Sequence, residues 1–242
     1  MKFGITSLLS AALLASTAVA DSFSWERLEK NNSVLVIVDI QEGLFQMVHD
    51  WDPIMARHNM LAYASLATVF TDLPVVMTSS AEVGPNGLIP QEIRDWYPEA
   101  PLIRRNGEVD AWDNPDFRAA IKATNRTQII IAGIVTDVCT AFLARSLRAE
   151  GYSVWAVIES SGTGTPSVRD IANAQMLRAG VNVVSLFAVF GDLMRDWRHV
   201  PGAAELYGWI DQWMPSYSYV ARAHKNAKLN GTVLPGQDGL PE

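Results

Sequence analysis

The sequence predicts an α/β fold, a three-layer, doubly wound and mainly parallel β-sheet with helices on both faces. Apolar stretches of strand length alternate with amphipathic stretches of helix length, a pattern typical of parallel strands joined by helices. Hydrophobicity in the strand-length stretches is continuous, which indicates that both faces of the sheet are covered. The chain has 242 residues, of which 49% are hydrophobic and 19% charged. This composition supplies a sizeable core and excludes general disorder.

The first half of the chain contains two expected strands and two expected helices. Residues 34–38 are apolar and mostly β-branched, which favours a strand. Residues 53–70 carry apolar side chains at helical spacing. A short apolar stretch at 74–77 predicts the second strand, and residues 115–122 predict the second helix.

The second half continues the alternation. The QIIIA stretch at 128–132 has a strong preference for a strand. Residues 137–149 and 167–178 predict helices, and a glycine follows each of them closely, as is common where helices end. Apolar stretches at 153–158 and 181–187 predict two more strands.

The chain reads as one domain with appended ends. Residues 33–198 contain no internal repeat and no linker rich in Pro, Gly or Ser, so we assign one domain to residues 21–215. Residues 216–242 are polar with scattered Gly and Pro, which predicts a C-terminal arm or a disordered tail.

The first twenty residues resemble a secretory signal peptide. Lys2 provides the positive charge, an apolar stretch follows, and Ala18-Val19-Ala20 fits the cleavage rule for small residues. The stretch is too short to span a bilayer, and a buried N-terminal helix is the weaker alternative. We expect a secreted protein, or a periplasmic one in a bacterium, whose mature chain begins at Asp21. N-terminal sequencing of exported protein tests this, and a mature chain that still begins at Met1 would contradict it.

Charge and cysteine content exclude several classes of partner and site. The net charge is −7 and no basic run is present, so neither nucleic acid nor an anionic membrane is an expected partner. The single cysteine excludes an intrachain disulfide framework and Cys-rich metal sites. The sequons at Asn31, Asn125 and Asn230 predict a glycoprotein only if the host is a eukaryote.

Candidate site residues follow the expected strands, because ligands of open α/β sheets bind outside the carboxyl ends of the strands. This rule selects Asp39, residues 78–87 and residues 133–139. No G-x-G-x-x-G or P-loop pattern is present, so dinucleotide and phosphate binding have no support. We therefore predict a small-molecule site at this edge and no cofactor.

Two of these residues carry suitable chemistry. Cys139 lies at the expected start of a helix, where free N–H groups lower the pKa of a thiol, although an inert buried cysteine is equally compatible. Asp39 follows five apolar residues, and poor solvation there suits a general base. A helix cap or loop carboxylate is the alternative for Asp39, with equal weight.

The sequence resembles the isochorismatase-like cysteine hydrolases, and most closely their YcaC-related subgroup. The segments that carry the resemblance are VLVIVDIQEGLF at 34–45, SSAEVGPNGLIPQEI at 79–93, APLIRRNGEVDAWDNPDF at 100–117, IIIAGIVTDVCTAFLARSLRAEGYSVWAVIESSG at 129–162 and FGDLMRDWR at 190–198. They appear in the order of the family, and the resemblance runs from about residue 30 to about residue 215.

The resemblance implies a catalytic set of Asp39, Arg105 and Cys139. The superfamily has Lys at the basic position, so Arg105 departs from that pattern, although Arg at this place resembles the YcaC-related subgroup. Arg stays protonated at neutral pH, so it acts only as a fixed charge and donor. The neighbouring Arg104 should point the opposite way in an extended segment. The resemblance further implies an oxyanion hole of the backbone N–H groups of Val135 and Cys139, beside a cis peptide near residues 135–136.

The implied activity is hydrolysis of a C–N, amide-type bond in a small molecule, with Cys139 as nucleophile and Asp39 as general acid and base. A thiol-based redox protein and a non-catalytic oligomeric scaffold are the alternatives. We expect a homo-oligomer, because the subgroup forms stacked rings. Phe45, Glu82 and Trp112 are candidates for the substrate pocket, each with ordinary packing or a loop salt bridge as the alternative.

No metal site is expected. Metal-binding relatives use an Asp-x-His triplet, and none of the four histidines lies in one. His49 and His58 are therefore interpreted as surface residues.

Overall fold

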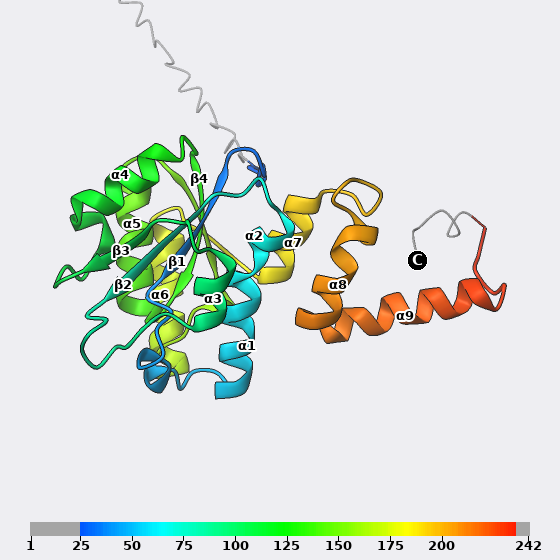
Figure 1. The fold of residues 1–242 in the computed structure, drawn as a ribbon, viewed down its shortest axis with the longest axis horizontal. Coiled ribbons are helices and arrows are strands. Elements are labelled where there is room, and N and C mark those ends of the chain that lie inside the picture. Colours follow the sequence, from blue (N-terminus) through cyan, green and yellow to red (C-terminus); the bar gives the residue numbers. More distant parts are fainter. Residues whose placement is uncertain (1–24, 236–242) are drawn as a thin grey trace, which may run out of the picture.

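A computed structural model describes residues 25–235 and contains one sheet of six parallel strands (Figure 1). The strand order is β3-β2-β1-β4-β5-β6. The strands are β1 (Ser33–Val38), β2 (Val75–Ser80), β3 (Leu102–Arg105), β4 (Gln128–Gly133), β5 (Ser153–Val157) and β6 (Asn182–Val184). The chain starts at β1, winds outward to β3, returns to β4 beside β1 and winds outward again to β6. The doubly wound topology confirms the predicted fold class, and its switch point lies between β1 and β4.

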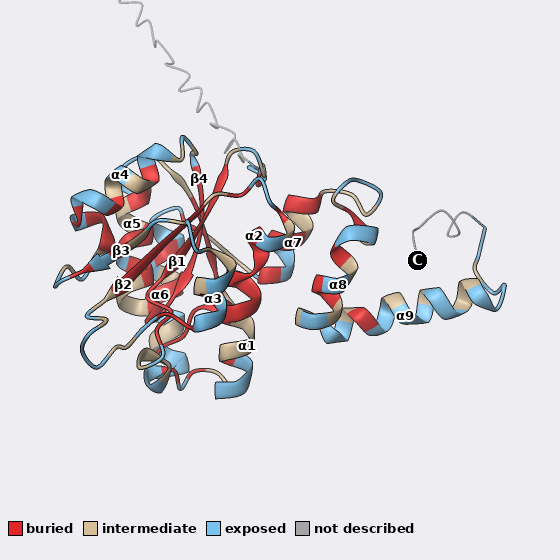
Figure 2. Ribbon diagram, in the orientation of Figure 1, coloured by how far each residue is buried: buried red, intermediate tan, exposed pale blue. Residues whose placement is uncertain are grey.

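Helices cover both faces of the sheet and bury two apolar clusters. The helices are α1 (Pro53–Ala64), α2 (Leu66–Val69), α3 (Gln91–Trp96), α4 (Pro115–Ala123), α5 (Ala141–Ala149), α6 (Pro166–Arg178), α7 (Leu186–Met194), α8 (Ala203–Trp213) and α9 (Pro215–Leu229). Helices α1, α2, α3, α7 and α8 contribute to the first cluster, and α4, α5 and α6 contribute to the second. All residues of β1 and β4 are buried (Figure 2), as their continuous hydrophobicity predicts.

Three helices begin at the same local signal, a polar cap followed by proline. The side chains of Asp52, Asn114 and Thr165 each accept a hydrogen bond from a backbone N–H of the first helical turn. The next residue in each case is Pro, whose fixed φ and missing N–H suit the first helical position. These signals explain why α1, α4 and α6 start close to their predicted positions.

Several predicted boundaries are wrong. The expected strand 181–187 ends at Val184, because the Ser185 side chain caps α7 by accepting from the Ala188 N–H (3.2 Å). The expected helix 53–70 is interrupted at Ser65, whose hydroxyl bonds to the Ala62 carbonyl (2.8 Å). The expected helix 137–149 begins with a π-helical turn, η3 (Thr136–Thr140), before α5. The strand β3 and the helices α3, α7 and α8 were not predicted.

The C-terminal helix α9 projects from the body of the molecule (Figure 1). Of its residues only Ser218 is buried. Within the described residues, the segment that the sequence assigns to an arm or a disordered tail, residues 216–242, begins with this helix.

The predicted signal peptide and Asp21 lie outside the described residues. The sequon residues Asn31, Asn125 and Asn230 are all exposed. Within residues 25–235 no helix has the length and apolar character to cross a bilayer.

Candidate active site

Asp39 lies directly after β1, at the switch point of the sheet, and is fully buried. Its backbone has a φ of 50°, which is uncommon for a residue other than glycine. Its N–H donates to the Thr78 carbonyl (3.0 Å), so the pairing of β1 with β2 continues past the strand end. Backbone strain of this kind concentrates at functional sites.

Arg105, the last residue of β3, forms an ion pair with Asp39, and neither side chain is exposed to solvent. Arg105 Nη2 donates to Asp39 Oδ2. Arg105 Nε donates to Thr78 Oγ1 (3.0 Å), which in turn donates to Asp39 Oδ1 (2.7 Å). Arg105 Nη1 donates to the carbonyls of Glu108 and Val109. The guanidinium thus holds the carboxylate once directly and once through a hydroxyl.

Thr78 was not predicted as a site residue, although it opens the segment 78–87 selected from the sequence. It pairs with Ile103 in the register of β2 and β3, two residues before Arg105, so Thr78 and Arg105 share a face of the sheet. A hydroxyl at the end of a strand, on the face of a buried arginine, is the signal that would have identified it. Arg104 points to the opposite face as predicted and pairs with Glu82 (2.7 Å).

Gln41, two residues after Asp39, holds the loop after β2 rather than the reacting groups. Its amide donates to the Ser80 carbonyl (3.0 Å) and accepts from the Ser80 N–H (2.8 Å), and it also donates to the Gly87 carbonyl. Gln41 itself is fully buried. These two residues therefore combine a buried carboxylate with an amide that fixes the neighbouring loop.

Cys139 lies in η3, which follows β4. At Gly133 a side chain is impossible, because a Cβ there would lie 1.9 Å from the Val38 carbonyl oxygen. The cis peptide joins Ile134 and Val135, one peptide bond earlier than predicted. The Thr136 N–H donates to the Gly162 carbonyl (2.9 Å), which ties the start of the turn to the loop after β5.

The structure brings the Cys139 thiol together with Asp39 and Arg105. Burial raises the pKa of the Cys139 thiol to about 12, and the charge and hydrogen bond of Asp39 add to this. Arg105 and the backbone N–H of Val135 act in the opposite direction. Burial lowers the pKa of Arg105, but Asp39 and the Cys139 side chain outweigh that effect and raise it overall.

The predicted lowering of the thiol pKa is wrong in direction. Cys139 lies within a turn, packed against the second apolar cluster, and a carboxylate faces it. Burial and the carboxylate outweigh the positive groups, so the thiol is protonated at neutral pH and hydrogen-bonded to Asp39. Such a thiol needs a base to become a nucleophile.

Alkylation of Cys139 by iodoacetamide at pH 7 is expected to be slower than that of a free thiol with its pKa near 8.5. Because the thiolate fraction rises about tenfold per pH unit below the pKa, the rate should keep rising up to about pH 11. Arg105→Ala should slow the reaction, and Asp39→Asn should leave it equal or faster. The measurement is the rate of mass increase across pH 6–11. A plateau near pH 8 would contradict the raised pKa.

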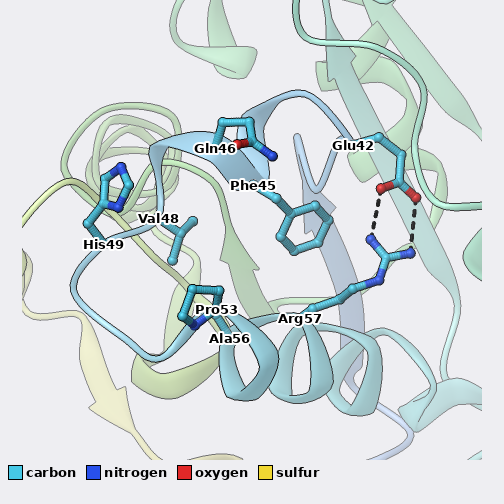
Figure 3. A pocket seen from close by; sticks show the side chains of 8 residues that line it. All are labelled: Glu42, Phe45, Gln46, Val48, His49, Pro53, Ala56 and Arg57. Carbon is cyan, nitrogen blue, oxygen red and sulfur yellow. Dashed lines mark hydrogen bonds and ion pairs between the residues drawn. The ribbon is translucent and has the colours of Figure 1, made fainter.

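The three candidate pocket residues lie in different surroundings. Phe45 lines a pocket of about 310 Å³ with Glu42 and Arg57, and the Arg57 guanidinium lies 5.0 Å from its ring (Figure 3). Phe45 packs against the first apolar cluster, whereas Cys139 packs against the second.

The other two pocket candidates have structural partners. Trp112 is 7% exposed and contacts the rings of Phe117 and Tyr152, which matches the alternative of ordinary packing. The Glu82 carboxylate forms the loop salt bridge with Arg104, but its Oε1 is buried without a hydrogen-bond partner.

The histidines differ in exposure. His49 is exposed, as expected of a surface residue, whereas His58 is partly buried and its Nε2 lies 2.9 Å from the Trp213 carbonyl. Among residues 25–235, no group of three or more His, Cys, Asp or Glu side chains is arranged to hold a metal ion.

Comparisons with known proteins place this geometry in a family. The model of the isochorismatase domain matches residues 33–186. The chain is 42% identical over 182 residues to a protein of Escherichia coli K12 named "Probable hydrolase YcaC", and the match covers 75% of this chain and 87% of that protein.

Solved structures show the same similarity. YcaC from Pseudomonas aeruginosa, solved with hexane-2,5-diol and covalent acrylamide, is 42% identical, with a TM-score of 0.80 over 84% of this chain and 98% of that one. The YcaC gene product of E. coli, described as an octameric hydrolase of unknown specificity, is 40% identical, with a TM-score of 0.81. The match covers 85% of this chain and 99% of that one.

Proposed function

The chain belongs to the isochorismatase family of hydrolases, in its YcaC-related subgroup, and on this premise we propose that it hydrolyses a C–N, amide-type bond of a small molecule through Cys139. The observation that carries the proposal is the hydrogen bond between the partly buried Cys139 thiol and Asp39, a carboxylate held by Arg105. A thiol beside a fixed base is the arrangement that nucleophilic acyl transfer requires.

The proposed reaction has two halves. Asp39 accepts the thiol proton as Cys139 Sγ bonds to the substrate carbonyl carbon, and the oxyanion forms beside the N–H groups of Val135 and Cys139. Protonated Asp39 then gives its proton to the leaving amine as the C–N bond breaks, which leaves a thioester. Asp39 next takes a proton from the attacking water, and the collapse of the thioester releases the acid and restores the thiol.

Arg105 supports this chemistry without taking part in proton transfer. Four of its contacts go to Thr78, Glu108, Val109 and Asp39, and it also faces Cys139. A guanidinium has five N–H groups and no acceptor, so Arg105 serves as a hydrogen-bond donor to each of these groups. Arg105 therefore acts as a fixed positive charge that holds the Asp39 carboxylate in place.

A panel of small amides assayed with the wild type and Cys139→Ala tests the proposal. We expect ammonia or amine release by the wild type and none by the variant. Sulfenic acid on Cys139 without turnover would indicate the redox alternative, which a protonated thiol disfavours because the thiolate is the form that is oxidised. The absence of both turnover and sulfenic acid would indicate a non-catalytic scaffold.

We expect the protein to form a homo-oligomer. The E. coli relative is octameric, and α9 exposes Tyr219, Val220 and Leu229 on an arm that the described chain itself does not cover. Light scattering at micromolar concentration should give a mass several times that of the chain, and truncation before Pro215 should reduce it. A monomeric full-length protein would contradict this expectation.

We also propose that the enzyme acts outside the cytoplasm. The support is the signal-peptide pattern of residues 1–20. Cell fractionation with an antibody tests it, and a protein found only in the cytoplasm would contradict it.

A further inference from the structure

We propose that Thr78 is a positioning residue for proton transfer, whose hydroxyl orients the Asp39 carboxylate toward Cys139. This inference rests on the proposed function. Thr78 is fully buried on β2, next to β1. Its hydroxyl accepts from Arg105 Nε and donates to Asp39 Oδ1. Apart from Cys139 itself, no other residue among those of residues 25–235 contacts both members of the buried ion pair through a side-chain hydrogen bond.

The donor and acceptor roles in the two hydrogen bonds of Thr78 Oγ1 follow from counting protons. A hydroxyl has one proton, and an arginine Nε can only donate. Thr78 Oγ1 must therefore accept from Arg105, which commits its own proton to Asp39. The lone pair of Oδ1 that faces Thr78 is thus kept as an acceptor and is unavailable for the proton of Cys139.

The same contacts fix the orientation of the carboxylate. Thr78 donates to Oδ1 and Arg105 Nη2 donates to Oδ2, so each oxygen of Asp39 is held by one donor. A carboxylate held at both oxygens cannot rotate about its terminal bond without breaking a buried hydrogen bond. Its remaining lone pairs stay aimed at the thiol, which is the geometric condition for efficient proton transfer.

The strand offers a matched control one residue away. Ser79 is also fully buried, and its hydroxyl has no hydrogen-bond partner. It follows Thr78 on the strand and therefore faces the opposite side of the sheet. Removal of this hydroxyl by Ser79→Ala changes burial and polarity on β2 without touching Asp39.

The test uses acylation of Cys139 by p-nitrophenyl acetate, a chromogenic probe that needs no knowledge of the natural substrate. The burst of p-nitrophenolate is measured for the wild type, Thr78→Val, Thr78→Ser and Ser79→Ala, with Cys139→Ala as the blank. Thr78→Val is expected to slow acylation by about 10- to 100-fold. The concentration of p-nitrophenyl acetate that gives half of the maximal acylation rate should stay within about threefold of the wild-type value. Thr78→Ser should restore most of the rate, and Ser79→Ala should match the wild type.

Three results would overturn the proposal. They are a rate for Thr78→Val equal to that of Ser79→Ala, a rate for Thr78→Ser as low as that of Thr78→Val, and no acylation of the wild type. If Thr78→Val does not fold, Thr78→Ala takes its place and must be slower than Thr78→Ser. Failure of the amide panel would remove the proposed substrate class and leave the acylation comparison intact, so the two failures are distinguishable.

Discussion

Asp39→Asn is expected to lower amide turnover by about 10²- to 10⁴-fold, the usual contribution of a general acid and base. The amide nitrogen cannot accept the proton of Cys139, so a thiol whose pKa is raised to about 12 has no base. The leaving amine also loses its proton donor. The measurement is kcat/KM on an amide that the wild type hydrolyses.

The same substitution should destabilise the protein. It leaves the guanidinium of Arg105 buried opposite a neutral group, and breaking a buried ion pair by removing one partner costs about 3–5 kcal/mol. Asp211→Asn is the matched control, because Asp211 pairs with Arg222 on the surface and such pairs contribute about 0–1 kcal/mol. In thermal unfolding, the melting temperature of Asp39→Asn should be clearly lower than that of Asp211→Asn. Full turnover by Asp39→Asn on a substrate that Cys139→Ala cannot process would refute the proton-transfer role.

Arg105→Lys is expected to lose activity by about 10- to 100-fold, although the charge is kept. A lysine has three donors on one nitrogen, whereas the guanidinium spans Asp39, Thr78 and two loop carbonyls. The ammonium can satisfy some of these acceptors and must leave the others without a donor, which also lowers the free energy of unfolding by about 1–3 kcal/mol.

Arg104→Lys is the control for this prediction. Arg104 lies on the same strand, is exposed and contacts only Glu82 among the ion pairs of residues 25–235. The steady-state rates of both variants and their melting temperatures are compared with the wild type. If Arg105→Lys is as active as Arg104→Lys, only the charge matters and the planar geometry of arginine does not.

The central strands and the helices around them were predictable because burial on both faces leaves a continuous apolar signal. Residues 128–132 and 153–158 lie within one residue of β4 and β5. The edge strand β3 reads Leu-Ile-Arg-Arg and lacks that signal, because half of its side chains face solvent or the site. At 181–187 the apolar run crosses from strand to helix, and only the capping by Ser185 separates them.

The placement of Asp39 and Cys139 at one edge of the sheet was predictable, but their electrostatics were not. The positions of Asp39 and Cys139 follow from the rule that sites lie at carboxyl ends of strands. The direction of the thiol pKa depends on how deeply η3 packs and on which charge faces the sulfur, and neither is encoded in local sequence. Thr78 was missed for the same reason, since its role arises from strands β1, β2 and β3 meeting side by side.

Rapid-quench mass spectrometry of the protein during turnover tests the central claim most directly. An amide hydrolysed by the wild type is mixed with enzyme, quenched in acid within milliseconds to seconds, and the protein is digested and mapped. We predict an acyl adduct on the peptide that contains Cys139, which forms and decays at the rate of turnover and is absent from Cys139→Ala. Turnover without an adduct on Cys139, together with undiminished activity of Cys139→Ala, would contradict thiol catalysis by this protein.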